Sequence, residues 1–286
     1  MKTKTILSII LASLAIISAT AQNNKIVKRD IDVRPFNAIT ASGGWDVIVR
    51  QGNRPSVSIE VSEAVLDRAV IEVKSGTLYI YNKRDKQSFT WKELRKMHHT
   101  MRNTVQKAYV TVTDLKNIKA SGGVDLFFET PLKTDDFELT MSGGTDLKKL
   151  MLSCNNFTGV FSGGSDAEIG FLGLENLKVT ASGGSDVALL DIAAQQCQIA
   201  ASGGSDMKLT GKTKDFTINA SGASDVSASD FETLHCNAVF SGAADGEIRV
   251  IESLDITVSG ASDVVCFGNP NRMNKNVSKS SSLKMR

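Results

Sequence analysis

Apolar and polar residues alternate with a period of two along most of residues 109–266, which indicates short strands that bury one face. A five-residue pattern, Ser-Gly-small-any-Asp, interrupts this alternation at regular intervals. Its serine occurs nine times, at Ser42, Ser121, Ser142, Ser162, Ser182, Ser202, Ser221, Ser241 and Ser259. After a first interval of 79 residues, successive serines lie 18 to 21 residues apart. Such self-similarity predicts a solenoid in which each repeat is one stacked unit.

Within each repeat, mainly apolar side chains recur one, three and five residues before the serine, and five and seven residues after it. Phe137, Leu139 and Met141 show the pattern before Ser142, and the last of the five positions is once charged, at Lys149. One repeat cannot bury its apolar face alone. We therefore predict an all-β fold, a parallel β-helix with about 20 residues per coil stacked at about 4.8 Å. A propeller is disfavoured because its blades need about 40 residues each.

The predicted single domain, residues 22–286, has four parts. Residues 31–82 are predicted to form strands and hairpins, and residues 109–267 hold the regular coils. Residues 83–107 interrupt the pattern with eight Lys and Arg residues against two acidic ones. This basic insertion is interpreted as a solvated loop or surface helix, or as a docking site for an acidic partner or surface glycan. Residues 268–286 fit the repeat with Lys279 and Ser282 replacing the first glycine and the aspartate, which predicts a degenerate capping coil.

Residues 1–21 have the organisation of a secretory signal peptide: two lysines, an apolar run over residues 6–17, and Ala19-Thr20-Ala21 before the cleavage point. The run is shorter than the ~20 residues of a spanning helix. We expect a protein exported to the periplasm, the outer-membrane surface or the medium, with no transmembrane segment after cleavage. Cleavage removes two of 33 Lys and Arg residues, which leaves 31 against 31 acidic residues. This balance gives no reason to expect nucleic acid as a partner.

The two glycine positions of the turn differ. The residue after the serine is glycine in all nine copies, whereas the next residue is alanine in three of them, at Ala223, Ala243 and Ala261. We predict that the first position needs a positive φ, which glycine adopts at little cost, and that the second needs only a small side chain.

The aspartate that closes each copy is the candidate site. Stacked coils would align these carboxylates in a ladder: Asp46, Asp125, Asp146, Asp166, Asp186, Asp206, Asp225, Asp245 and Asp263. In a structural interpretation, each carboxylate accepts hydrogen bonds from the N–H groups of its own turn. In a functional one, the ladder binds calcium, because stacked carboxylates repel and attract counter-ions. The spacing of calcium-binding nonapeptides is absent, which favours the structural interpretation, and no metal or cofactor is predicted.

Other chemistry is sparse. Cys197 and Cys236 share an apolar column with Phe216 between them, which places them about 9.6 Å apart. A disulfide needs about 7 Å or less, so the cysteines are interpreted as small buried hydrophobes. Of the three histidines, His235 is predicted to face outward. No catalytic motif is present, and no catalytic residue is predicted.

Four stretches carry a resemblance: P-F-N-A-I-T-A-S-G-G-W-D-V-I-V-R-Q-G, L-K-N-I-K-A-S-G-G-V-D, the S-G-G-S-D repeats, and the closing F-G-N-P with V-S-K-S-S-S. They are similar to the GIN-domain family of auto-transporter adhesin heads, over about residues 31–285. The resemblance implies a right-handed β-helix exported to the bacterial envelope, without catalytic residues. The basic insertion is longer and more basic than the family pattern.

The sequence thus favours a non-catalytic, adhesin-like recognition module that presents a surface for a glycan or a protein. One alternative is a carbohydrate-active β-helix enzyme, a polysaccharide lyase or hydrolase, which a cluster of Asp, Lys and Arg in one exterior groove would support. The other is a structural envelope protein that assembles end to end.

Overall fold

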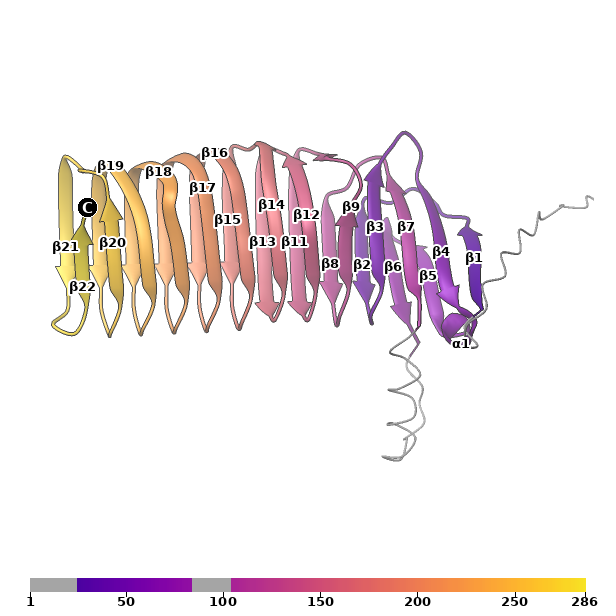
Figure 1. Ribbon diagram of the computed structural model, residues 1–286. Helices are drawn as coiled ribbons and strands as arrows, with labels where there is room; N and C mark the ends of the chain where they lie inside the picture. Colours follow the sequence, from indigo (N-terminus) through magenta and orange to yellow (C-terminus); the bar gives the residue numbers. More distant parts are fainter. Residues whose placement is uncertain (1–24, 84–103) are drawn as a thin grey trace, which may run out of the picture.

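The computed structural model describes residues 25–83 and 104–286, which form an elongated β-solenoid (Figure 1). The predicted parallel β-helix with about 20 residues per coil is confirmed. The predicted signal peptide and most of the basic insertion lie outside the described residues. Within those residues, no helix is long and apolar enough to cross a membrane.

The N-terminal elements are β1 (Ile26–Ile31), β2 (Ala38–Ser42), β3 (Asp46–Gln51), β4 (Ser56–Ser62), α1 (Glu63–Leu66), β5 (Ala69–Lys74), β6 (Thr77–Asn82) and β7 (Gln106–Val112). The coils that follow contain β8 (Asn117–Ser121), β9 (Asp125–Phe128), β10 (Leu132–Lys133), β11 (Asp136–Gly143), β12 (Asp146–Ser153), β13 (Asn156–Gly163), β14 (Asp166–Gly173), β15 (Asn176–Ala181), β16 (Asp186–Ala201), β17 (Asp206–Ala220), β18 (Asp225–Phe240), β19 (Asp245–Val258), β20 (Asp263–Phe267), β21 (Arg272–Val277) and β22 (Ser282–Met285).

Each coil has one strand before the glycine turn and one after it, and both pair in parallel with their counterparts in the neighbouring coils. β11 pairs with β13 in register from Asp136↔Asn156 to Gly143↔Gly163, and β12 pairs with β14 from Asp146↔Asp166. From β16 to β19, the strand after one turn continues around a bend into the strand before the next. Like positions are therefore neighbours along the solenoid axis, and every sequence column becomes a straight row.

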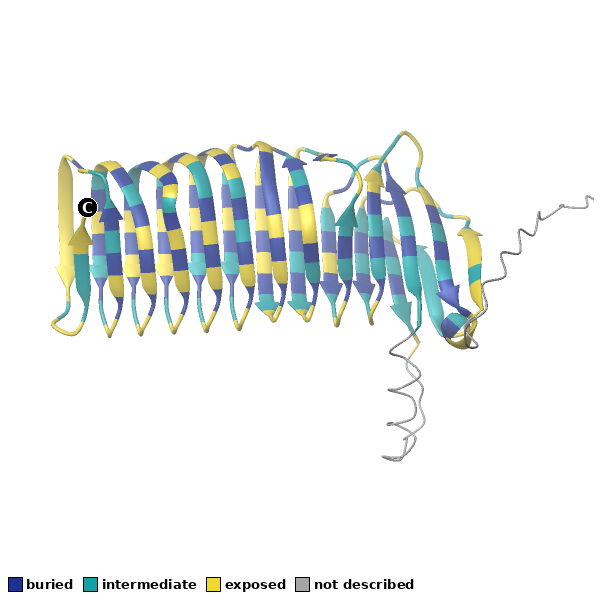
Figure 2. Ribbon diagram, in the orientation of Figure 1, coloured by how far each residue is buried: buried dark blue, intermediate teal, exposed yellow. Residues whose placement is uncertain are grey.

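The predicted core columns lie inside the solenoid, so buried and more exposed residues alternate along most strands of the regular coils (Figure 2). The prediction was wrong at Lys149, which is exposed. A bulge in β12 shifts its register, so that Leu150 instead pairs with Ile169 and is fully buried. The extra residue of a bulge lets the strand turn both Lys148 and Lys149 to solvent without opening the core.

The first interval of 79 residues is an excursion after which the chain forms the coil next to the first one. β8 pairs directly with β2, and β9 with β3, so Ser121 lies beside Ser42 and Asp125 beside Asp46. On the other side of the first coil, β6 pairs in parallel with β2, and β7 with β3. β6 and β7 thus form one further coil, in which the end of β6 at Asn82 and the start of β7 at Gln106 lie beside the first glycine turn.

Antiparallel strands close this end of the solenoid. β4 pairs with both β7 and β1, and β5 pairs with β6. The carbonyls of the first glycine turn receive side-chain partners there: Asn82 Nδ2 donates to the Gly43 oxygen at 3.0 Å, and Gln106 Nε2 to the Gly44 oxygen at 3.5 Å. These two amides replace the backbone N–H groups that a further stacked turn would supply.

At the other end, β21 and β22 form the last coil. Val277 pairs with Val258, and Ser282 with Asp263. Met273 lies five residues before Ser278 and pairs in register with Leu254 of the preceding coil. Met273 is 39% exposed, whereas Leu254 beneath it is only 2% exposed. The degenerate repeat therefore covers the apolar column of the coil before it.

The first glycine of all nine turns has a positive φ, between 69° and 87°, as predicted. The prediction for the second glycine was wrong in the first two turns, where Gly44 and Gly123 also have positive φ. The hydrogen bonding explains the difference at Gly44. In later turns, the third residue donates to the preceding coil, as Gly184 N–H does to the Gly163 oxygen at 2.7 Å, whereas Gly44 N–H donates to the following coil.

The four cysteines are free and buried in the core, as the interpretation as small hydrophobes predicts. Cys197, Phe216 and Cys236 follow one another in one row. Burial raises the pKa of Cys154 to about 12 and that of Cys266 to about 11, and it raises the pKa of Cys197 and Cys236 further.

Gly183→Ala should destabilise the protein more than Gly184→Ala. Gly183 has a φ of 78°, and an added Cβ would lie 2.8 Å from the Gly163 oxygen, so we expect a loss of at least about 2 kcal/mol. At Gly184, φ is ordinary and the nearest atom is 3.9 Å away, so we expect a change within about 0.5 kcal/mol. Urea unfolding measures both, and equal losses would contradict this account of the turn.

Native protein should resist thiol alkylation at pH 8, because the thiols are buried and their pKa values are raised. All four cysteines should react once guanidinium unfolds the chain. Mass spectrometry after a short iodoacetamide pulse counts the modified thiols. Rapid labelling of Cys197 or Cys236 in the native state would show that the core opens readily.

Candidate binding surfaces

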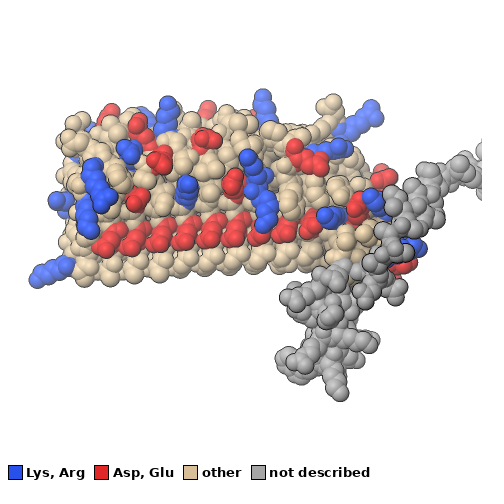
Figure 3. All heavy atoms as spheres, in the orientation of Figure 1, with Lys and Arg blue, Asp and Glu red and all other residues tan. Residues whose placement is uncertain are grey.

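The nine predicted aspartates form one exposed or half-exposed row along the solenoid. Parallel register joins neighbours from Asp46 to Asp245, and the backbone N–H of Asp263 donates to Asp245 Oδ1 at 2.9 Å. Figure 3 shows this aspartate ladder as a continuous line of acidic side chains. Lys107 pairs in register with Asp46 at one end, and Ser282 with Asp263 at the other. The structure therefore brings together all nine residues, including the one separated by 79 residues.

The structure differs from the structural interpretation, in which each carboxylate accepts hydrogen bonds from the N–H groups of its own turn. In the described part of the chain, no ladder carboxylate accepts a hydrogen bond from an N–H of its own turn. The partners of these carboxylates come from other positions, such as the Ser282 hydroxyl, 2.5 Å from Asp263 Oδ1, and Lys148 Nζ, 2.6 Å from Asp146 Oδ2. The reason is direction: the aspartate points outward, away from the turn backbone.

The residue before each aspartate supports the turn instead, a role that the sequence analysis missed. This position is fully buried in every copy, at Trp45, Val124, Thr145, Ser165, Ser185, Ser205, Ser224, Ala244 and Ser262. Its serine hydroxyls can bond within the turn, as Ser224 Oγ does to the Ser221 oxygen at 2.9 Å and Ser185 Oγ to the Ser182 oxygen at 3.2 Å. The recurrence of Ser at this position was a signal that could have revealed it.

Burial and the neighbouring carboxylates raise the pKa of several carboxyl groups in the aspartate ladder. Burial and then the neighbouring carboxylates Asp166 and Asp206 raise the pKa of Asp186. The pKa values of Asp125 and Asp225 are raised for the same two reasons. Among the described residues, no group of three or more His, Cys, Asp and Glu side chains is arranged to hold one metal ion. The calcium interpretation of the ladder stays a prediction.

The strands before the turns present a second surface with different chemistry. Their outward side chains form three rows over eight coils, from β11 to β21, and we call this surface the polar face. The row nearest the turn is Thr140, Val160, Thr180, Ala200, Asn219, Val239, Thr257 and Asn276. The middle row is Glu138, Thr158, Lys178, Gln198, Thr217, Asn237, Asp255 and Asn274. The outer row is Asp136, Asn156, Asn176, Gln196, Asp215, His235, Ser253 and Arg272.

Amide and hydroxyl side chains dominate the polar face. They make up 14 of its 24 residues, against four carboxylates and two cations. Several are ordered by contacts along the axis: Asn156 Nδ2 donates to Asp136 Oδ1 at 2.7 Å, and Asn176 Nδ2 to Asn156 Oδ1 at 2.8 Å. The polar face is thus a regular, mostly uncharged array, in contrast to the aspartate ladder.

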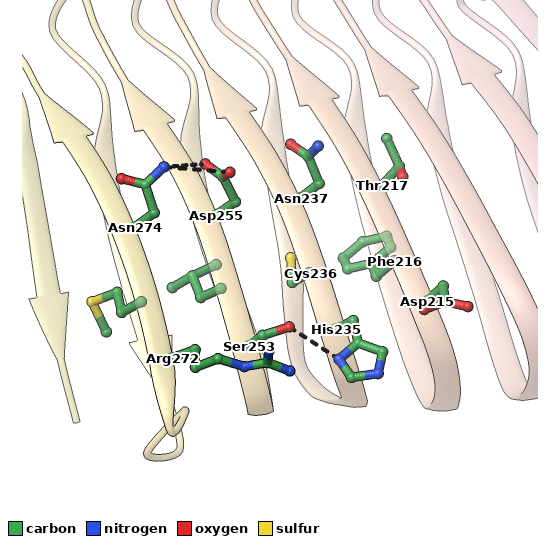
Figure 4. Close-up of a pocket in the computed structure, with 12 residues that line it drawn as sticks. Asp215, Phe216, Thr217, His235, Cys236, Asn237, Ser253, Asp255, Arg272 and Asn274 are labelled. Atoms are coloured by element: carbon green, nitrogen blue, oxygen red, sulfur yellow. Dashed lines mark hydrogen bonds between the residues drawn. The ribbon is translucent and has the colours of Figure 1, made fainter.

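An open groove lies on the C-terminal half of the polar face (Figure 4). Asp215, His235, Ser253 and Arg272 follow one another in its outer row. The middle row adds Thr217, Asn237, Asp255 and Asn274, and Asn274 Nδ2 lies 3.4 Å from both oxygens of Asp255. Sequence reasoning placed His235 outward but did not assemble this group, although the column six residues before the serine contains all four members of the outer row.

His235 lies between a hydroxyl and a carboxylate. Its Nδ1 is 3.0 Å from Ser253 Oγ, and its Nε2 is 3.9 Å from Glu252 Oε2. Ser253, His235 and Glu252 thus follow the order of the nucleophile, the base and the orienting acid in a catalytic triad. However, the flanking backbone of β19 is paired with β18 and β21, so its N–H groups belong to the sheet rather than to an oxyanion site. The trio can bind a polar ligand, but it lacks the elements of an acyl-transfer site.

The groove also contains Asp and Arg, the residue types that would favour a carbohydrate-active enzyme, but no lysine lines it. Asp215 and Asp255 lie two coils and two residues apart, which is roughly 12 Å between Cα atoms. The two carboxylates belong to different rows of the face, and that of Asp255 already contacts the Asn274 amide.

Asp186→Asn should raise the melting temperature at pH 7. Because the folded-state pKa of Asp186 is raised above 3.8, its favourable contribution is present at low pH and lost as the pH rises through that folded-state value. The gain from Asn should therefore vanish at pH 3. Asp146→Asn is the control, because it also removes the 2.6 Å contact with Lys148 and should gain less. A lower melting temperature of Asp186→Asn at pH 7 would contradict ladder repulsion.

Comparison with known proteins places this fold among bacterial relatives. A protein from Parabacteroides merdae described as a "putative adhesin" has a TM-score of 0.66 at 18% identity, with 92% of this chain and 97% of that chain covered. A "putative lipid binding protein" from Parabacteroides distasonis has a TM-score of 0.65 at 18% identity, covering 92% and 98%. A "putative adhesin" from the same species has a TM-score of 0.62 at 16% identity, covering 92% and 98%. No curated protein matches the chain.

The model of one protein family matches residues 35–187 and 162–270, which together span the first glycine turn, the aspartate ladder and nearly all of the polar face. They contain most of the stretches that carry the resemblance in the sequence, while V-S-K-S-S-S, at residues 277–282, lies beyond them. The chain belongs to the family described as "Putative auto-transporter adhesin, head GIN domain".

Proposed function

We propose that this protein is a non-catalytic, adhesin-like recognition module of the bacterial envelope, which binds a glycan or protein ligand on its polar face. The observation that carries the proposal is the regular array of amide and hydroxyl side chains, with a groove lined by His235, Asn237 and Asp255. Family membership and the adhesin names of the structural neighbours support an adhesin-like role. The rigid solenoid holds these groups at fixed spacing, which lowers the entropy lost on binding.

The chemistry of the groove also bears on the ligand. Planar carboxylate, amide, imidazole and guanidinium groups alternate there as hydrogen-bond donors and acceptors. Of the apolar residues that also line the groove, Phe216, Cys236 and Leu254 are buried in the core, and Met273 is 39% exposed. This set suits a hydroxyl-rich or peptide-like ligand better than a lipid, the ligand class in the name of one structural neighbour.

The test is a binding screen of residues 22–286 against glycan arrays and envelope proteins, followed by two variants. Thr217→Arg places a long cation in the groove and should weaken binding of any hit at least about tenfold. Ser227→Arg is the matched control, because Ser227 is exposed on the strand that follows a turn and borders the aspartate ladder.

Binding that Ser227→Arg weakens and Thr217→Arg leaves intact would move the site to the ladder and contradict the proposal. Depolymerisation of a glycan during the screen would favour the enzymatic alternative. Running each assay with calcium and with chelator tests the ladder as a cation site, since loss of binding under chelator would support that interpretation.

A further inference from the structure

We infer that the ligand of the polar face is a linear, uncharged polysaccharide that lies along the solenoid axis, with one sugar unit per coil. This inference rests on the proposed function and specifies its ligand. Four features of the polar face carry it: its period, its hydrogen-bonding groups, its order and its small apolar patches.

The period of the face selects the kind of polymer. Equivalent positions recur once per coil, at about 4.8 Å, through register pairs such as Thr158↔Lys178 and Thr217↔Asn237. A ligand that contacts several coils in the same way must repeat at nearly that distance. An extended polypeptide presents side chains on one face every ~6.6 Å and so loses register after one coil. The sugar-to-sugar repeat of an extended β-1,4-linked chain is close to one strand spacing. Because successive sugars are turned over, the same sugar edge faces the protein at every second coil.

The side chains of the face suit a neutral polyol. Sugar hydroxyls both donate and accept, as the amides and hydroxyls that form 14 of the 24 positions also do. Four carboxylates and two cations give the face no strong field for a polyanion or a polycation. The aspartate ladder, on the strands that follow the turns, would repel an anionic polymer that approached the solenoid.

Several of these groups are already ordered without a ligand. Asn156 and Asn176 each donate one N–H to the neighbour one coil before, at 2.7 and 2.8 Å, and each retains a second N–H for a ligand. His235 and Ser253 are joined at 3.0 Å. Since such side chains are restrained along the axis, a polymer lying along the same axis costs less conformational entropy on binding.

The row nearest the turn supplies apolar contact. Val160 and Val239 are 38% and 37% exposed there, and Ala200 lies between them in the same row. Sugar rings have apolar C–H faces as well as polar edges, so these patches can cover ring faces while the amide rows bind hydroxyls. The face thus offers both kinds of contact along its length.

The experiment titrates the protein with neutral β-1,4-linked gluco-, manno- and xylo-oligosaccharides of increasing length, from a disaccharide to an octasaccharide, by calorimetry. Affinity for at least one series should rise with length over several units before it levels off. Thr158→Arg and Thr217→Arg lie three coils apart in the middle row, and each should weaken the longest oligosaccharide at least about tenfold. Ser227→Arg should change affinity less than twofold.

The outcomes separate this inference from the proposed function. Affinity that is independent of length, with Thr158→Arg inert and Thr217→Arg damaging, would show a compact site and overturn the axial arrangement while leaving a glycan-binding module. Binding to proteins but to no oligosaccharide would overturn the glycan and leave the adhesin-like function. Absence of any binding, by a protein whose circular dichroism and melting temperature are normal, would overturn both.

Discussion

The structure depends on one close backbone contact, the stacking of successive glycine turns. From Gly164 onward, the N–H of the third turn residue donates to the first glycine of the preceding turn over 2.6 to 3.1 Å. An added Cβ on the first glycine of these later turns would lie only 2.3 to 2.9 Å from the preceding turn. No side chain fits there, so this position is glycine in all nine full copies of the turn. Because the turns stack without offset, the strands on either side are held in register and every column becomes a row.

This strict register has opposite electrostatic effects on the two surfaces. After each turn it repeats a carboxylate nine times in line, and the ladder is left with Lys148 and Lys107 as its ion-pair partners in the described residues. Before each turn it aligns amides and hydroxyls, which satisfy one another along the axis, as Asn176 does with Asn156. The same geometry thus makes one row mutually repulsive and the other mutually supportive. That difference is why ligand recognition is assigned to the polar face.

The repeat made the fold and the nine-residue ladder predictable, because period and parity depend on local sequence alone. The features that the repeat could not predict depend on contacts between coils. The bulge that expels Lys149 is visible only when Leu150 pairs with Ile169. The reversed hydrogen bond at Gly44, whose φ is positive, is made with Gly122, a neighbour 78 residues away in the chain. The groove around His235 required side chains from four coils to be placed side by side, although their common column was present in the sequence.

The excursion between β3 and β8 has a consequence for how such proteins change in length. Between Ser121 and Ser259 each coil pairs with its two neighbours through similar turns, so a whole coil can be duplicated or excised while the rows stay continuous. The N-terminal unit has no such freedom. β2 lies between β6 and β8, and β3 lies between β7 and β9, and all four flanking strands come later in the sequence. Evolution can therefore adjust the reach of the molecule only from the regular coils, while its starting unit changes residue by residue.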